Sequence, residues 1–229
     1  SDWGSATSWP LIATTMSLVA TYTRSAWMGA FVSGLVILAG VWPWGLAVLA
    51  VGAAFAWRFV GGGLGERLHS MVQPHSGYNG ERLLMWGAGW RMFRAHPLTG
   101  VGLQDLHAVY PAYRSPLATE EVGHLHSTFV QIAATMGLMG LAAFGFLYAA
   151  LVRACAGGWR EHLTGIPAGL RLGVTAALAG FLVAGCFEWN FGDEELLHLL
   201  YLLVGLAWAA RAWGEAGTEA RASAAAETP

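Results

Sequence analysis

The sequence predicts an all-α protein, a polytopic membrane helix bundle with a large polar loop. Of its 229 residues, 55% are hydrophobic and only 11% are charged, whereas a soluble domain usually carries about 25% charged residues. The 12 Trp support the same class, because Trp is enriched where a membrane meets water. Several uncharged runs are long enough to cross a bilayer as helices, which takes about 20 residues. The net charge of -2 is too small to indicate nucleic acid as a partner.

The N-terminal part is predicted to contain three apolar helices. Residues 10–22 form the first, because a Pro is tolerated in the first turn of a helix. Residues 25–57 carry no charge but are too many for one span. Pro43 stands near their middle, between two Trp residues. We therefore expect a helical hairpin of residues 25–41 and 44–60 that turns at Pro43.

A polar segment follows at residues 61–125. It is rich in His and Arg, and a loop of this length in a compact protein is usually functional or disordered. Its apolar residues are numerous enough for it to fold. We expect short helices within it, one at residues 81–95 that Pro97 stops, and a second at residues 102–113.

The C-terminal part is predicted to contain three further spans, at residues 127–152, 166–187 and 196–210. A short acidic turn at residues 188–195 separates the last two spans. The tail, residues 214–229, is rich in Ala, Glu, Thr and Gly. Such a composition predicts a disordered tail.

The orientation of the bundle follows from the positions of Arg. Arg residues cluster after the span at residues 127–152, and positive residues in short loops stay in the cytoplasm. Alternation then places the polar segment 61–125 and the acidic turn 188–195 outside. We expect residues 1–229 to be one membrane domain and the C-terminal part of a longer protein, since Ser1 is no initiator Met and no signal-peptide pattern precedes the first span.

Two Arg residues are candidates for binding an anion. Arg24 interrupts apolar sequence. It either faces the interior of the bundle, as Arg within a span usually does, or marks a helix end and reaches the headgroups. Arg82 falls on the aromatic face of the predicted helix at 81–95. It either stacks on Trp86 or offers its guanidinium fork to phosphate oxygens.

His126 is the candidate acid–base group, because a neutral imidazole accepts a proton near pH 7. On a helical projection it lies on the small-residue face of the following span, so it should point into the bundle. It could equally be a His bonded at a helix N-terminus, and spacing does not exclude His124 as a competitor. Glu188 and Asp193 could bind a cation or contact a sugar acceptor, although a solvated turn is the commoner explanation. No His or Cys has metal-ligand spacing, so no metal site is predicted.

Five short motifs follow one another along the chain: Thr23-Arg24-Ser25-Ala26-Trp27, Arg82-Leu83-Leu84-Met85-Trp86, His96-Pro97-Leu98-Thr99-Gly100-Val101-Gly102, His126-Ser127-Thr128-Phe129 and Gly137-Leu138-Met139-Gly140-Leu141. Together they resemble the bacterial O-antigen ligase family, whose shared domain also occurs in O-antigen polymerases and bacterial O-linked oligosaccharyltransferases. The resemblance covers roughly residues 10–210, and the motifs occur in the family's order. One departure is that the family's usual His-Asn is His-Ser at residues 126–127.

The resemblance implies a membrane glycosyltransferase that needs neither a cofactor nor a metal. It would move a glycan from undecaprenyl diphosphate to an acceptor hydroxyl. The acceptor is lipid A–core in ligases, a growing glycan in polymerases, and a Ser or Thr of a protein in oligosaccharyltransferases. By motif, Arg24 and Arg82 would hold the diphosphate and His126 would act on the acceptor hydroxyl. The protein would then lie in the bacterial inner membrane, with residues 61–125 as a periplasmic catalytic loop.

A transporter of a lipid-linked or anionic substrate is an alternative from another class, because Arg within a span also suits that function. Against it, the candidate residues fall at one membrane face, and the sequence shows no internal repeat of the kind that transporters often have. The residues and the resemblance together favour ligase-like transfer to lipid A–core. A polymerase and a protein O-oligosaccharyltransferase remain the alternatives within the class.

Overall fold

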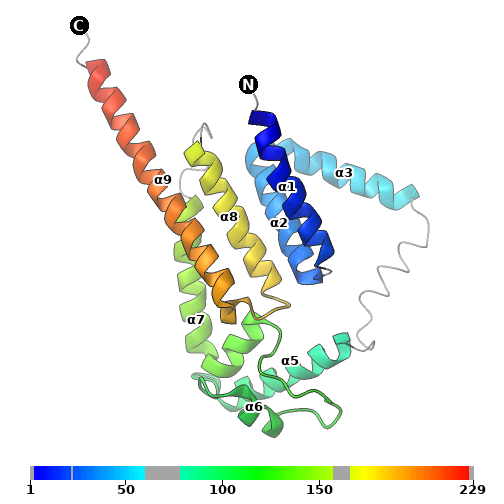
Figure 1. Cartoon of the computed structure of the whole chain (residues 1–229). Helices are drawn as coiled ribbons and strands as arrows, with labels where there is room; N and C mark the ends of the chain where they lie inside the picture. Colours follow the sequence, from blue (N-terminus) through cyan, green and yellow to red (C-terminus); the bar gives the residue numbers. More distant parts are fainter. Residues whose placement is uncertain (1–2, 22, 60–77, 157–165, 227–229) are drawn as a thin grey trace.

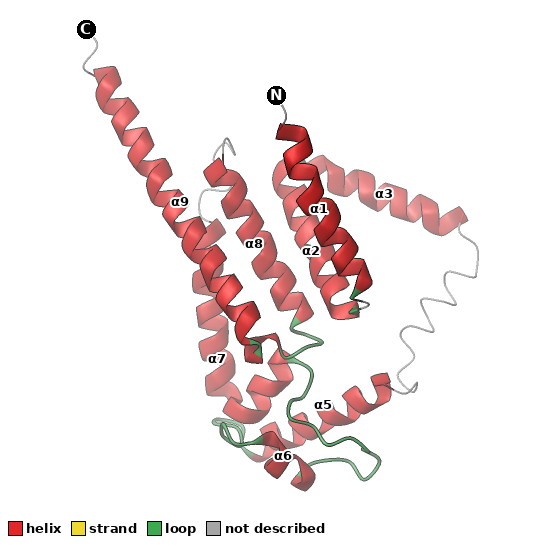
Figure 2. Cartoon of the chain, in the orientation of Figure 1, coloured by secondary structure: helices red, strands yellow, loops and turns green. Residues whose placement is uncertain are grey.

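The computed structural model describes residues 3–21, 23–59, 78–156 and 166–226 (Figure 1). All regular secondary structure in these ranges is helical (Figure 2), which confirms the all-α fold class. The helices at residues 3–20, 24–41, 128–156, 166–184 and 194–226 lie roughly alongside one another, the helix at residues 43–59 points away from them, and the helices of the polar segment lie across one end (Figure 1). Predictions that fall on residues 60–77, 157–165 and 227–229 lie outside the described residues.

The predicted helix break at Pro43 is confirmed, but the two helices do not form the expected hairpin, because the second extends away from the first at a wide angle (Figure 1). Helix α2 (Arg24–Val41) ends two positions before Pro43, and helix α3 (Pro43–Phe59) begins at that Pro. Pro is favoured at the first position of a helix because its missing N–H needs no partner at that position. Helix α1 (Trp3–Ala20) begins earlier than predicted, so its Pro lies inside the helix rather than in the first turn.

Helix α2 packs closely and antiparallel against α8 (Ile166–Ala184). Gly29 and Gly180 face each other so closely that a Cβ added to Gly29 would lie 2.8 Å from the Gly180 carbonyl oxygen. Ser33 donates a 2.8 Å hydrogen bond to the carbonyl of Ala176. Small residues allow such an approach between membrane helices. This antiparallel register places Arg24 at the same end of the bundle as the C-terminus of α8.

Helix α7 (Thr128–Ala156) is interrupted, whereas the sequence predicted a continuous span. Gly137 has φ 63° and ψ -155°, a region of backbone space that is essentially restricted to Gly. The break leaves backbone groups of α7 without partners in the helix, and the motif at residues 96–102 supplies them. Four backbone hydrogen bonds join the two segments: Val101 N to Ala134 O at 2.9 Å, Gly102 N to Thr135 O at 3.0 Å, Leu138 N to Pro97 O at 2.8 Å and Met139 N to Leu98 O at 3.1 Å.

Replacing Gly137 by Ala is expected to destabilise the protein. A Cβ at this position would lie 2.5 Å from the backbone carbonyl of Leu98, and the backbone conformation alone costs a residue with a side chain about 1–3 kcal/mol. We expect a lower melting temperature in detergent. Gly145→Ala on the same helix is the matched control, since a Cβ there meets nothing within 4 Å, and it should be neutral or stabilise by up to about 1 kcal/mol. Equal stability of the two variants would contradict the assigned role of the break.

The polar segment folds against the start of α7. Helix α5 (Tyr78–Ala95) begins three residues earlier than predicted, and the second helix is shorter than predicted, comprising α6 (Leu106–Val109) and a 3-10 turn (Tyr110–Ala112). Asp105 sets the start of α6, because its side chain accepts a hydrogen bond from the His107 N–H. The buried core of this part consists of Met85, Ala88, Met92, Leu106, Tyr110, Val122, Leu125 and Ala134.

The second core joins α7, α8 and α9 (Glu194–Ala226) around Phe144, Tyr148, Leu178 and Leu200. The tail that was predicted to be disordered continues α9 as far as Ala226; Ala, which fills much of it, has the highest helix propensity. By length and composition, two described helices could cross a membrane, Arg24–Val41 and Thr128–Cys155, with shorter apolar helices at Pro43–Gly52 and Ala168–Ala184. The polytopic bundle therefore remains a prediction.

Candidate functional site

Arg82 on α5 is bound to the turn that follows α8. Its Nη1 donates a 2.7 Å hydrogen bond to the carbonyl of Phe187, and its Nη2 forms a salt bridge with Oε1 of Glu188. The side chain is only 16% exposed. Arg82 thus lies inward from the surface of α5, with a carboxylate against its guanidinium.

His126 lies immediately before α7, not in it. Its φ of 47° is the one positive value found for a non-Gly residue in the described ranges, so the helical projection that the sequence suggested does not apply. The turn is fixed at Leu125, whose N–H donates to Gln131 Oε1 at 2.9 Å and whose carbonyl accepts from Trp86 Nε1 at 3.1 Å. The ring of His126 lies against Glu188, with 3.2 Å between Nδ1 and Oε2.

Glu188 brings the two predicted residues together. One carboxylate oxygen contacts Arg82 and the other contacts His126. Its backbone carbonyl accepts hydrogen bonds from both the N–H and the hydroxyl of Thr128, each at 3.0 Å. The expectation of a solvated turn is therefore wrong for Glu188, whose side chain is 29% exposed and paired on both oxygens. Its position as the first charged residue after an apolar span was a signal that could have identified it.

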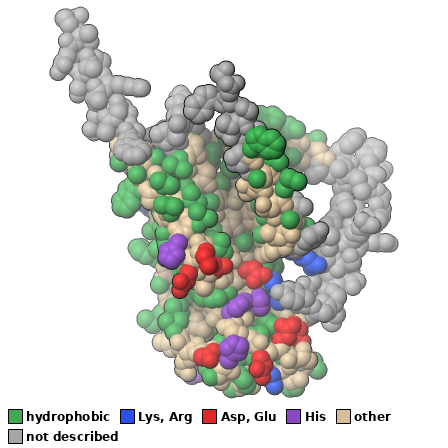
Figure 3. Space-filling model, viewed as in Figure 1, with side chains coloured by type: hydrophobic (Ala, Val, Ile, Leu, Met, Phe, Trp, Pro, Cys, Tyr) green, Lys and Arg blue, Asp and Glu red, His purple; other side chains and the backbone are tan. Residues whose placement is uncertain are grey.

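His124 and Asp193 lie beside this cluster. The ring of His124 is 4.2 Å from the ring of His126, centroid to centroid, and burial, followed by the neighbouring His126, lowers the pKa of His124 below 6.5. A hollow of about 650 Å³ adjoins Glu188, with a mostly polar lining. In Figure 3 the acidic and His side chains gather on the lower half of the visible face, with apolar side chains around them. The hollow is lined by His124, Glu188, Trp189, Asn190, Gly192, Asp193, Glu194 and Glu195.

Arg24 lies apart from the cluster formed by Arg82, His126 and Glu188. It is the first residue of α2 and its side chain is exposed. The antiparallel register with α8 puts it at the end of the bundle where Glu188 follows α8. Among the described residues, the structure shows no hydrogen bond or ion pair between Arg24 and this cluster. The structure thus joins two of the three predicted residues through Glu188, which contacts both, and leaves the third at the same end of the bundle.

The arrangement has a definite chemical capacity. When Nδ1 of His126 donates to Glu188, Nε2 is left as an acceptor that can take a proton from a hydroxyl. The guanidinium of Arg82 offers a planar pair of donors that match a carboxylate or a phosphate. Within the described ranges, no group of three or more His, Cys, Asp or Glu side chains is placed to hold a metal ion.

A family model described as O-antigen ligase matches residues 9–145. The matched stretch includes Arg24, Arg82 and His126, whereas Glu188 lies beyond it. No curated protein matches the chain.

Proposed function

Because the chain belongs to the O-antigen ligase family, whose members are membrane enzymes of glycosyl transfer, we propose that it transfers a glycan from undecaprenyl diphosphate to an acceptor hydroxyl. The acceptor we propose is lipid A–core, as in the ligases themselves. The observation that supports this proposal is the contact of Arg82 and His126 with one carboxylate, that of Glu188. Arg82 can bind a phosphate and His126 can accept a proton from a hydroxyl. Only the side chain of Glu188 separates the two.

Arg82 is proposed to hold the diphosphate of the donor. When the bond between the sugar and the diphosphate breaks, the electron pair leaves with the phosphate oxygen, and negative charge grows there. Once the diphosphate has replaced Glu188 at Nη2, a guanidinium that the Phe187 carbonyl still holds in place stabilises this charge, and we propose that the step needs no metal. Arg24 supplies a second positive charge from the end of α2. Binding of the diphosphate requires Oε1 of Glu188 to release Nη2 of Arg82, since both anions use the same donor.

His126 is proposed to act as the general base. The acceptor oxygen attacks the anomeric carbon of the glycan, and its proton passes to Nε2 of His126. Glu188 accepts the hydrogen bond from Nδ1 and stabilises the imidazolium that forms, a role that carboxylates commonly play beside a catalytic His. The proton is then released to water, and the diphosphate leaves on its lipid.

The contacts within the bundle support a site at one membrane face. Thr128 at the start of α7 is bonded to Gly185 and Glu188 after α8, whereas Arg171 near the start of α8 donates to the carbonyl of Cys155 near the end of α7. The two helices are therefore antiparallel, with His126 at one end and Cys155 and Arg171 at the other. Since short Arg-rich loops stay in the cytoplasm, we propose that residues 1–229 form one inner-membrane domain and that residues 61–125 form its periplasmic loop.

Glu188→Gln separates the two roles of this carboxylate. The amide keeps the size of the side chain, but it competes less for Arg82 and orients His126 less well. We expect kcat to fall by about 10–100-fold, while the KM for the lipid-linked donor stays equal or decreases. Glu195→Gln, on the rim of the same hollow, is the control and should leave both constants unchanged. A raised donor KM with an unchanged kcat would contradict both assigned roles, because it would mean that the carboxylate aids donor binding and not catalysis.

The proposed function is tested with the full chain reconstituted in liposomes that contain an undecaprenyl-diphosphate-linked glycan and lipid A–core. A covalent lipid A–core–glycan product, identified by mass spectrometry and dependent on His126, is the expected result. Offering a glycan or a Ser-containing peptide as the acceptor distinguishes a polymerase or a protein-glycosylating enzyme. Movement of the lipid-linked glycan across the bilayer with no covalent product would contradict the proposal and indicate a transporter.

A further inference from the structure

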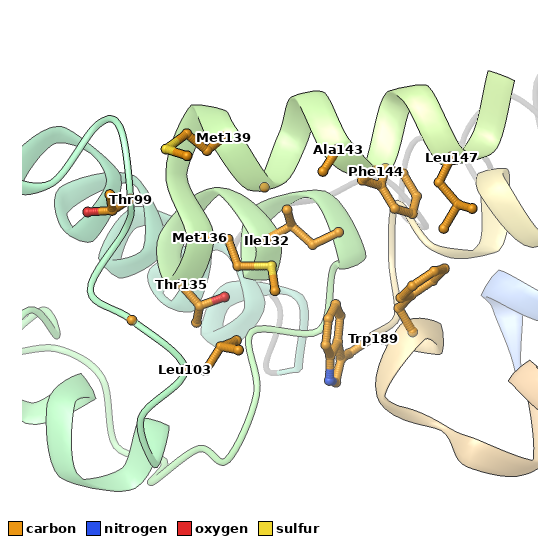
Figure 4. A pocket seen from close by; sticks show the side chains of 13 residues that line it. Thr99, Leu103, Ile132, Thr135, Met136, Met139, Ala143, Phe144, Leu147 and Trp189 are labelled. Carbon is orange, nitrogen blue, oxygen red and sulfur yellow. The ribbon is translucent and has the colours of Figure 1, made fainter. Parts of the chain in front are cut away.

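The break in α7 opens a second hollow, which the catalytic proposal leaves unused. It has a volume of about 580 Å³ and lies between residues 128–136 and residues 138–147 of the same helix. Figure 4 shows Ile132, Thr135 and Met136 reaching into it from the first segment, and Ala143 and Phe144 facing them from the second. The remaining lining residues are Thr99, Gly102, Leu103, Met139, Gly140, Leu147, Trp189 and Phe191.

The lining offers a ligand hydrocarbon surface and few polar groups. The Thr99 hydroxyl donates to the carbonyl of Gly100 at 3.3 Å, and the Thr135 hydroxyl donates to the carbonyl of Gln131 at 2.8 Å. Both hydroxyls of the lining are therefore already used within the protein. A cavity of this volume is within the usual range for ligand sites, about 300–1,000 Å³. Its chemistry favours a ligand segment that needs no hydrogen bonds.

The hollow is held open by the backbone and does not result from loose packing. Residues 96–102 are hydrogen-bonded to both sides of the break at Gly137, so the two segments of α7 cannot rejoin into one helix without losing these bonds. Leu103 and Met139 on its rim are 79% and 65% exposed. The hollow lies within the apolar stretch Thr128–Cys155, where a lipid chain could enter it from the bilayer.

The hollow lies close to the cluster of Arg82, His126 and Glu188, and this position indicates which lipid it binds. Trp189 forms part of its wall and directly follows Glu188, the partner of Arg82. If Arg82 holds the diphosphate of a donor, the lipid chain attached to that diphosphate therefore starts beside Trp189. Met136 and Met139 are flexible, polarizable side chains that adapt to an irregular apolar shape, such as a branched isoprenoid. We propose that the hollow between the two segments of α7 binds the isoprenoid chain of the lipid-linked donor; this inference rests on the proposed function.

The inference is tested by photolabelling the full-length protein in detergent. The probe is a polyprenyl diphosphate, without a glycan, that carries a diazirine in its isoprene units. In the wild type we expect mass spectrometry to find the label on residues 132–147. Ala143→Trp fills the hollow and should reduce this labelling by about tenfold or more. Ala142→Trp is the matched control, because Ala142 is exposed on the same helix outside the lining, and it should label as the wild type does.

Competition and activity separate the possible outcomes. Unlabelled undecaprenyl diphosphate should suppress the label, whereas a diacyl phospholipid at the same concentration should not. Equal labelling of the two Trp variants, a label confined to other helices, or equal competition by the phospholipid would overturn the inference. Glycan transfer is measured with the same samples. Labelling as expected in a protein that transfers no glycan would refute the proposed function while supporting the isoprenoid site.

Discussion

His126→Ala is expected to lower glycan transfer by about 10²–10⁴-fold, the usual contribution of a general base. The loss should appear in kcat, with little change in the KM for the donor, because His126 acts on the acceptor hydroxyl. The measurement is the initial rate of product formation at saturating donor and acceptor, with purified protein in liposomes. The pH dependence should change too, since the group that accepts the proton has been removed.

His124→Ala is the matched control for this variant. His124 is two residues away, and its ring lies 4.2 Å from that of His126. His124 also carries an imidazole, but the carboxylate of Glu188 is bonded to the ring of His126. We expect His124→Ala to retain most of the activity. A greater loss in His124→Ala than in His126→Ala would transfer the role of the base to His124.

Arg82→Ala is expected to lower kcat/KM for the lipid-linked donor by about 10²–10³-fold, as the loss of one fixed donor to a developing anion does in other enzymes. Arg82→Lys should lower kcat/KM almost as much as Arg82→Ala does. Lys provides a point charge, whereas Arg presents two parallel donors, as it does here to the Phe187 carbonyl and Glu188. Steady-state kinetics with varied donor concentration measure both effects.

Arg91→Ala is the control for a structural effect of losing an Arg from α5. Arg91 lies on the same helix, and its Nε also donates to a backbone carbonyl, that of Tyr113, at 2.7 Å. We expect this variant to lose some thermal stability and to keep its kcat/KM. If both Arg variants lost activity in proportion to their melting temperatures, the assignment of Arg82 to the diphosphate would be rejected.

The helices were largely predictable because they follow apolar patterns and local stop signals. Pro43 separates two helices where the sequence predicted a break, and the fold class is confirmed. The break in α7 was not predictable from α7 itself. Gly137 is an ordinary residue in an apolar run, and its conformation depends on a segment that precedes it by about 40 positions in the sequence, with which the helix shares backbone hydrogen bonds.

The candidate site was predictable in its members and not in its arrangement. Arg82 and His126 could be identified from the sequence because ionisable groups next to apolar sequence are costly and are commonly functional. Their common partner, Glu188, lies in another turn, and only the packing of α7 against α8 brings it to them. The orientation of His126 depends on a left-handed turn that no helical projection reproduces. The packing of α2 against α8 places Arg24 at the same end of the bundle as the cluster. Its role in binding the diphosphate remains a prediction.

The central claim is that the diphosphate of the donor binds beside His126, on Arg82. It is tested most directly by modifying His residues with diethyl pyrocarbonate, with and without a saturating isoprenoid diphosphate, and reading His126 by mass spectrometry. Exposed His96 on the same segment serves as the internal reference. The account predicts that the diphosphate slows modification of His126 in the wild type and has no such effect in Arg82→Ala. Unchanged modification of His126 in the saturated wild type would contradict it.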